Sequence, residues 1–210
     1  LYTNTTGAIN AALGFQALNA NTTGSQNVAV GGYSLDANTT ASYNTAIGTH
    51  SLSANTTGAS NTALGAYAAD VTTTGSNLVA VGVGALGANT TGANNVALGN
   101  NSLYANTTGG NNTAVGFEAL KTNTTADYNV AVGRRALYLN TTGTADVALG
   151  QGALESNTTG SDNTALGYAS MGSCTTGGDN TAVGRESLSA ATTGSDNVAV
   201  GYQALKDNTE

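Results

Sequence analysis

The residues that could carry out chemistry are few in this chain, and they have no recurring partners. His50 is the only histidine and Cys174 the only cysteine. A catalytic site brings unlike groups together with shifted pKa values, and a reactive cysteine needs a base or a positive charge beside it. The sequence singles out no such partner for either residue. We therefore interpret both as tolerated substitutions, and we expect no catalytic residue and no enzyme activity.

Motifs that bind cofactors or metals are missing or stand in the wrong context. Residues Gly82–Gly87 read GVGALG and fit the pattern Gly-x-Gly-x-x-Gly. A dinucleotide-binding loop of this kind opens a helix, which this segment does not predict, and no Gly-x-x-x-x-Gly-Lys-Ser/Thr sequence occurs. The Asp residues do not follow the Gly-Gly-x-Gly-x-Asp spacing of calcium-binding β-rolls. We expect no cofactor, no cofactor-binding residue and no metal ligand.

The charge balance excludes several kinds of partner. Five Lys and Arg residues stand against twelve Asp and Glu, which gives a net charge of −7. Nucleic-acid binding requires a basic face, so we expect no nucleic-acid partner. No stretch approaches 18 consecutive apolar residues, so this segment does not predict membrane insertion. We interpret Arg134–Arg135 and Arg185–Glu186 as solvated side chains, with contact to an anionic glycan as the alternative.

Nine Asn-Thr-Thr triplets fit the N-glycosylation pattern, and Asn100 and Asn111 fit it as well. If these Asn side chains point outward, they could carry a stripe of glycans. The interpretation that we favour is a structural ladder of stacked Asn and Thr side chains. The nine triplets begin at Asn4, Asn21, Asn38, Asn55, Asn89, Asn106, Asn123, Asn140 and Asn157.

The same triplets reveal the organisation of the chain. Three leading residues, twelve 17-residue units and three trailing residues account for all 210 residues without an insertion or deletion. We expect one uninterrupted repeat array over residues 1–210 that is a section of a longer chain. The units begin at Asn4, Asn21, Asn38, Asn55, Thr72, Asn89, Asn106, Asn123, Asn140, Asn157, Cys174 and Ala191.

Each position of the unit has its own residue preference. Positions 2 and 3 are always Thr, position 9 is always Ala, and position 11 is always Gly. Position 10 is always Val, Leu or Ile, while position 15 is Leu and position 7 is Asn in ten units each. All nine Tyr and 14 of the 17 charged residues fall in the variable positions 5, 6, 12, 13 and 16. Such a division between constant small or aliphatic positions and variable bulky ones indicates the inside and outside of a solenoid.

The period predicts an all-β fold, a parallel β-solenoid (β-roll or β-helix) with one coil per unit. Helical repeats need roughly 33–47 residues per unit, and Asn, Thr and Gly are poor helix formers. Positions 7–11 alternate like a strand, and we expect a second short strand over positions 13–17. Gly at positions 4 and 11 is expected to supply positive φ at the corners. We expect positions 10 and 15 to form the core: Val30, Leu35, Val81, Leu86, Val115, Leu120, Val132, Leu137, Val200 and Leu205.

This predicted core is thin. Two sizeable apolar side chains per coil barely offset the entropy of ordering seventeen residues. Either each coil is a flat two-layer roll rich in backbone and Asn hydrogen bonds, or several chains share a core, and the constant Ala position favours the second. The constant Ala on the other face of the strand predicts a close-packed contact between chains at Ala29, Ala80, Ala114 and Ala131. The expected partner is therefore the chain itself, as a homo-oligomer that is either a trimer or a filament.

Two families contain similar motifs. The segment Asn27–Gly31 (NVAVG) resembles the core motif of head repeats in trimeric autotransporter adhesins. The longer segment Asn106–Leu120 (NTTGGNNTAVGFEAL) is more similar to shaft repeats of phage-type tail-fibre proteins. The first resemblance implies left-handed β-rolls, three chains side by side, on a bacterial surface, and the second implies a fibre shaft. The 17-residue unit is longer than that of the adhesin heads.

These observations predict a structural, self-associating fibre subunit outside the cell, on the surface of a cell or a virion. The alternative is an adhesin that binds cell-surface glycans through the variable positions 12, 13 and 16. Ice binding is a third and disfavoured reading. It needs regularly spaced Thr on one side of a strand, whereas the adjacent Thr residues of each unit are expected to point in different directions.

Overall fold

A computed structural model describes residues 2–209 of the chain. Its regular elements are twelve three-residue strands, one in each unit, and no helix occurs within these residues. We call the units coils 1 to 12, with coil 1 at residues 4–20 and coil 12 at residues 191–207. The strands are β1 (Ala11–Leu13), β2 (Val28–Val30), β3 (Thr45–Ile47), β4 (Thr62–Leu64), β5 (Val79–Val81), β6 (Val96–Leu98), β7 (Thr113–Val115), β8 (Val130–Val132), β9 (Val147–Leu149), β10 (Thr164–Leu166), β11 (Thr181–Val183) and β12 (Val198–Val200).

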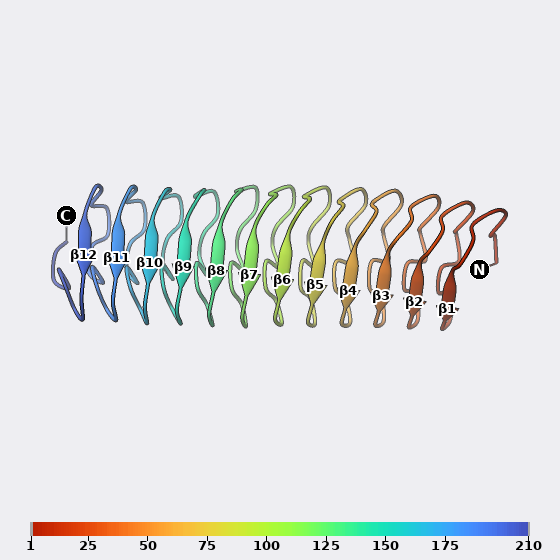
Figure 1. Ribbon diagram of the computed structural model, residues 1–210, viewed down its shortest axis with the longest axis horizontal. Coiled ribbons are helices and arrows are strands. Elements are labelled where there is room, and N and C mark those ends of the chain that lie inside the picture. Colours follow the sequence, from red (N-terminus) through yellow and green to blue (C-terminus); the bar gives the residue numbers. More distant parts are fainter. Residues whose placement is uncertain (1, 210) are drawn as a thin grey trace.

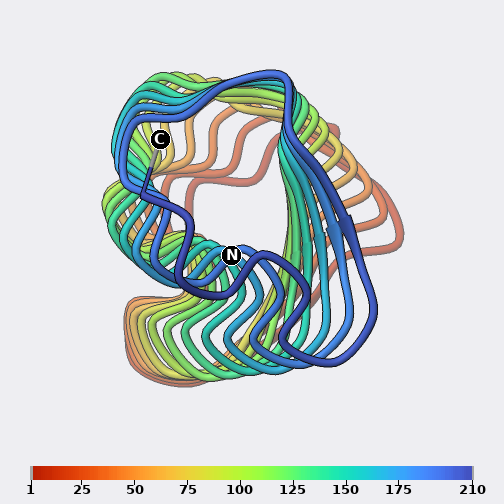
Figure 2. The ribbon, with the colours of Figure 1, turned by 90° about the vertical axis from the view of Figure 1, so that its left-hand side faces the viewer.

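The twelve strands form one parallel sheet in sequence order. Each residue pairs with its equivalent 17 residues later, as Ala114 does with Ala131. Figure 1 shows the coils side by side along the long axis, with the two ends of the chain far apart. Viewed along that axis, each coil lies over its neighbour with a small progressive rotation (Figure 2). The predicted parallel β-solenoid with one coil per unit is confirmed.

The middle residue of each strand points into the coil, which corrects the predicted role of position 9. Except for Ala12 in the first coil, its Ala side chains are buried within a single chain, so they cannot form the predicted contact between chains. The four residues concerned are Ala29, Ala80, Ala114 and Ala131.

Position 10 points outward, so five of the ten predicted core residues are misplaced. Val30, Val81, Val115 and Val132 are half-buried on the outer face, and Val200 is 68% exposed. The interior behind the strand already holds the buried Leu and Asn side chains, so the inward strand position takes only a methyl group.

Position 15 points inward as predicted. Leu35, Leu86, Leu120 and Leu137 are fully buried. Leu205 belongs to coil 12, which no further described coil covers, and it is 49% exposed.

The expected second strand over positions 13–17 is not formed, because this segment is a series of turns. Every described coil has a positive φ at positions 6, 13 and 15, as at Glu118 (φ 56°) and Leu120 (φ 53°). This region costs a residue with a side chain about 1–3 kcal/mol. Burial of the Leu side chain holds the backbone in this conformation, which turns the chain back toward the next strand.

The two Gly positions serve different purposes. Position 11 has the predicted positive φ, for example 133° at Gly116, but the prediction is wrong for position 4. At position 4 the coils approach closely, so that a Cβ at Gly109 would press against the carbonyl oxygen of Ala126. Ala41 and Ala126 also occupy position 4. A methyl group is therefore accommodated at this position when the neighbouring coils shift slightly apart.

Replacing Gly31 by Ala should destabilise the fold, whereas the same change at the adjacent Gly32 should not. A Cβ at Gly31 would lie 2.6 Å from the carbonyl oxygen of Gly48 at a φ of 130°, and a Cβ at Gly32 would meet nothing within 4 Å. We expect Gly31→Ala to lower the free energy of unfolding by about 1–3 kcal/mol. Denaturant unfolding followed by circular dichroism compares the two variants, and equal stability would contradict the packing described above.

Candidate functional site

The first polar feature of the interior is an amide ladder at position 1. Asn21 Nδ2 donates to Asn4 Oδ1 of the preceding coil at 2.8 Å and to the Gly24 carbonyl oxygen of its own coil at 3.0 Å. Buried amides are thus bonded both along the axis and within the coil. The axial bond recurs at 2.9–3.2 Å from Asn38 to Asn21, Asn55 to Asn38, Asn106 to Asn89, Asn123 to Asn106, Asn140 to Asn123 and Asn157 to Asn140.

A second ladder runs through position 7. The backbone N–H of Asn112 donates to Asn95 Oδ1 at 2.9 Å, and Asn112 Nδ2 donates to the Ala126 carbonyl oxygen of the next coil at 2.8 Å. Through its backbone N–H and its side chain together, Asn112 therefore joins three consecutive coils. These bonds replace hydration for backbone groups that the short strands leave unpaired.

Position 1 departs from Asn at Thr72, Cys174 and Ala191, so the ladder is interrupted at coil 5 and ends at coil 10. Thr72 and Cys174 stand where the next Asn would be, and the preceding Asn55 Oδ1 and Asn157 Oδ1 are buried without a hydrogen-bond partner. An unsatisfied buried acceptor costs about 1–3 kcal/mol. These two breaks are weak points of the solenoid.

The ladder decides against glycosylation of the folded chain at the nine Asn-Thr-Thr triplets. Asn4 is half-buried, with its Nδ2 bonded to the Gly7 carbonyl oxygen. In contrast, Asn100 and Asn111, which fit the same sequence pattern, are exposed. The other eight Asn residues are completely buried: Asn21, Asn38, Asn55, Asn89, Asn106, Asn123, Asn140 and Asn157.

Asp146 replaces Asn in the second ladder and is completely buried. Its Oδ1 accepts from the Asn163 backbone N–H at 2.9 Å and from Asn163 Nδ2 at 3.1 Å, and its Oδ2 accepts from Asn157 Nδ2 at 3.1 Å. Loss of hydration raises the pKa of this carboxyl to about 7, although the bonds from Asn163 and Asn157 partly offset the effect. Asp146 had no distinguishing signal in the sequence except that it interrupts an Asn position.

Cys174 also lies inside, with its Sγ 3.7 Å from the Gly177 carbonyl oxygen. Burial raises the pKa of the thiol, which favours the unreactive protonated form. Gly82–Gly87 begins directly after β5 and continues into turns, so its geometry is that of the other corners.

His50 lies on the outside, between two aromatic rings. Its ring stacks on Tyr33 at 4.9 Å and on Tyr67 at 5.4 Å between centroids. Partial burial raises the pKa of Asp36 and Asp70, and the charge of nearby His50 opposes that rise. The sequence interpretation of His50 as isolated missed these neighbours, which the 17-residue spacing places in the adjacent coils.

This outer cluster does not form an enclosed site. The Ser53 hydroxyl, in the same coil as His50, donates to the Asp70 carbonyl oxygen at 3.1 Å.

Residues 2–209 enclose no pocket, and they contain no group of three or more His, Cys, Asp and Glu side chains suited to a metal ion. Nor is any helix within that range long and apolar enough to cross a membrane.

The outer face of the sheet, which we call the sheet face, is a uniform part of the surface. It consists of positions 8 and 10 of every coil, where only Ala, Val, Thr, Leu and Ile occur. Leu64 is 46%, Leu149 41% and Leu166 40% exposed. The sheet face is thus uncharged and mostly apolar over the whole array.

Charged side chains lie at the corners that flank the sheet. Arg135 Nη1 contacts Glu155 Oε1 at 2.7 Å, and Arg185 Nη2 contacts Glu186 Oε1 at 3.2 Å. The guanidinium group of Arg135 also lies 4.1 Å from the centroid of the Tyr138 ring. The predicted solvated Arg side chains are thus partly paired on the surface.

The chain was compared with protein-family models, with curated proteins and with solved structures, and nothing in any of the three comparisons matches it.

Restoring the first ladder should stabilise the protein. Thr72→Asn gives the buried Asn55 Oδ1 a donor in the geometry that neighbouring coils already use, and we expect a gain of about 1 kcal/mol in the free energy of unfolding. Asn106→Ala breaks three buried hydrogen bonds and should lower the free energy of unfolding by about 1–3 kcal/mol. Denaturant titration measures both changes. A loss of stability in Thr72→Asn would show that the ladder does not control stability at this coil.

Asp146 should make stability fall as pH rises from about 4 to about 7. The carboxyl ionises near 3.8 when unfolded but near 7 when folded, so over this range the folded state binds more protons. This shift corresponds to roughly 3–5 kcal/mol. We expect Asp146→Asn to flatten the fall in unfolding free energy measured across these pH values. Asp196→Asn, at an exposed residue of coil 12, is the control that should leave the slope nearly unchanged.

Proposed function

We propose that this chain is a structural, self-associating segment of an extracellular fibre displayed on a cell or virion surface. The observation that carries this proposal is the sheet face, an uncharged and largely apolar strip along one side of the solenoid. Exposed apolar patches of this extent mark interaction surfaces in soluble proteins.

The size of the sheet face fits a protein partner. Two positions in each of twelve strands give 24 residues, and a standard interface uses roughly 20–30 residues on each side. Enclosed ligand sites are concave, whereas the described residues enclose no pocket. An extended partner surface therefore fits better than a small molecule.

A second copy of the chain is the partner that matches the sheet face most simply. Side chains repeat along this face at the spacing of parallel strands, about 4.8 Å. Another copy has the same spacing, so apolar side chains can interdigitate from coil to coil without a loss of register. The resemblance to tail-fibre shafts and adhesin heads supports the same assignment.

The adhesin alternative also has an observation in its favour. Position 12 carries the exposed aromatic residues Phe117 (46%), Tyr168 (49%) and Tyr202 (67%), and aromatic rings with a polar group are common in recognition surfaces. Saturable binding of the isolated protein to a glycan array, lost on replacing Tyr168 and Tyr202 by Ala, would favour this function.

Two Lys residues placed on the sheet face should prevent self-association. Val115→Lys with Val130→Lys removes two apolar contacts worth about 1.5–3 kcal/mol each, which is roughly 10- to 150-fold in association constant per site. Thr108→Lys with Thr125→Lys adds the same charge to the exposed position 3 of the same two coils. We expect only the first pair to shift the protein toward monomer in sedimentation velocity. A wild-type chain that remains monomeric at all concentrations would overturn the proposal.

A further inference from the structure

The basic residues of the chain all lie along one corner of the solenoid. Lys121, Arg134, Arg135, Arg185 and Lys206 occupy positions 12, 13 and 16 of coils 7 to 12. The same positions of these coils hold three Glu residues, so this corner, which we call the basic edge, has a net charge of +2 (5 − 3) within a chain of net charge −7.

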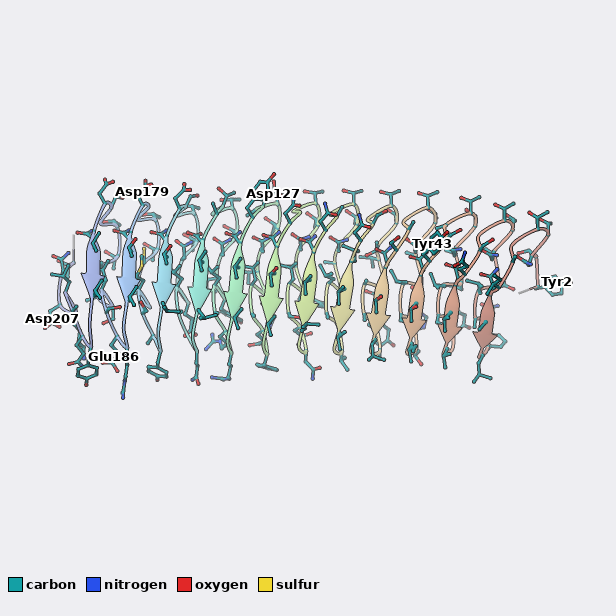
Figure 3. The ribbon with its side chains drawn as sticks, in the orientation of Figure 1. Tyr2, Tyr43, Asp127, Asp179, Glu186 and Asp207 are labelled. Atoms are coloured by element: carbon teal, nitrogen blue, oxygen red, sulfur yellow. The ribbon has the colours of Figure 1, made fainter. Side chains whose placement is uncertain are left out.

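The opposite corner is acidic in the same coils. Asp127, Asp162, Asp179 and Asp196 occupy positions 5 and 6, with no basic residue at these positions. Asp162, Asp179 and Asp196 are exposed, and Asp127 is half-buried. Figure 3 shows Asp127 and Asp179 at one margin of the solenoid and Glu186, which belongs to the basic edge, at the other. We call this corner, with a charge of −4, the acidic edge.

The Glu residues of the basic edge are already paired with basic side chains of the same edge, which leaves Arg134 without an ion pair. Glu118 contacts Lys121 at 2.6 Å, and Glu186 contacts Lys206 at 3.0 Å. Hydrogen bonds from Gln203 and Lys206 lower the pKa of Glu186 to about 2, so this carboxylate stays ionised. Arg134 is exposed and forms no ion pair with any described residue.

Each strand runs from the acidic edge to the basic edge, because positions 5 and 6 precede it and positions 12 and 13 follow it. When copies related by rotation about the fibre axis turn their sheet faces toward that axis, the acidic edge of one lies beside the basic edge of the next. An antiparallel pair packed face to face about a two-fold axis along the strands places like edges together instead. The two arrangements bury similar apolar surface but differ in their electrostatics.

We propose that the acidic edge of one copy pairs with the basic edge of its neighbour, and that this pairing selects a parallel arrangement with equal coils at equal heights. The inference rests on the proposed self-association. Rotation without translation brings Asp127 level with Arg134 in coil 8 and Asp179 level with Arg185 in coil 11. Exposed ion pairs contribute little affinity, so their effect is on orientation and register.

Charge exchange tests the pairing. The basic-edge variant, Arg134→Asp with Arg185→Asp, has a net charge of −11 (−7 − 4), and the acidic-edge variant, Asp127→Arg with Asp179→Arg, has −3 (−7 + 4). We expect each to weaken association at least about tenfold at low salt. The variant with all four changes keeps −7 and should recover association to within about threefold of wild type. A mere effect of net charge would instead strengthen association in the acidic-edge variant.

Disulfide trapping tests the orientation. Asp162→Cys and Tyr168→Cys lie in coil 10 on opposite edges, so a disulfide between them must join two copies. We expect this double variant to form covalent oligomers under mild oxidation. The control, Asp162→Cys with Asn100→Cys, places the second thiol at the same position of coil 6, four coils away, and should not cross-link. Efficient dimers from Asp162→Cys alone would show that like edges meet, which overturns the proposal.

The two proposals can fail separately. If the wild-type chain is monomeric, both the proposed self-association and the proposed edge pairing are wrong. A wild-type chain that associates through the sheet face, but whose association is unchanged by either edge variant, overturns the edge pairing alone. Loss of heparin binding in the basic-edge variant with unchanged association would assign the basic edge to an anionic glycan and would likewise overturn the pairing.

Discussion

The structure depends on one constraint, that every residue stacks on its own equivalent 17 positions away. A side chain is acceptable only if it tolerates a copy of itself, or a close relative, one strand spacing along the axis. Asn satisfies this condition because its amide both donates and accepts, as between Asn21 and Asn4. Thr22 satisfies it by donating to the carbonyl oxygen of Thr39. Gly116 and Ala114 satisfy it because they occupy little space.

Much of the fold could be predicted from the sequence, because a constraint repeated twelve times is visible as a period. The 17-residue unit indicated the coil, the constant Leu indicated the interior, and the Asn positions indicated ladders. The pattern of polar ladders also identified Thr72 and Cys174 as exceptions, and the structure shows that buried acceptors stay unsatisfied beside them. The candidate surfaces followed less directly, since the contact between chains was predicted at Ala residues that are buried within a single chain.

That error has a physical origin. Alternation within β7 (Thr113–Val115) distinguishes two faces but does not say which one is inside, and hydrophobicity favours Val over Ala as the inward residue. The choice depends on the space that Leu120 and the two ladders leave behind the strand. This volume became visible only with the turn geometry, in which Leu120 has a positive φ that no propensity would predict for Leu.

The two ladders share one interruption, at coil 5, where Thr72 and Leu78 replace both Asn residues. The backbone N–H of Leu78 still donates to Asn61 Oδ1, but the Leu78 side chain cannot form a hydrogen bond to coil 6. Under tension along the axis, the coils bear the load in series, like the links of a chain. We expect coil 5 to separate from its neighbours first, so that a rod built from otherwise similar repeats yields at a defined place.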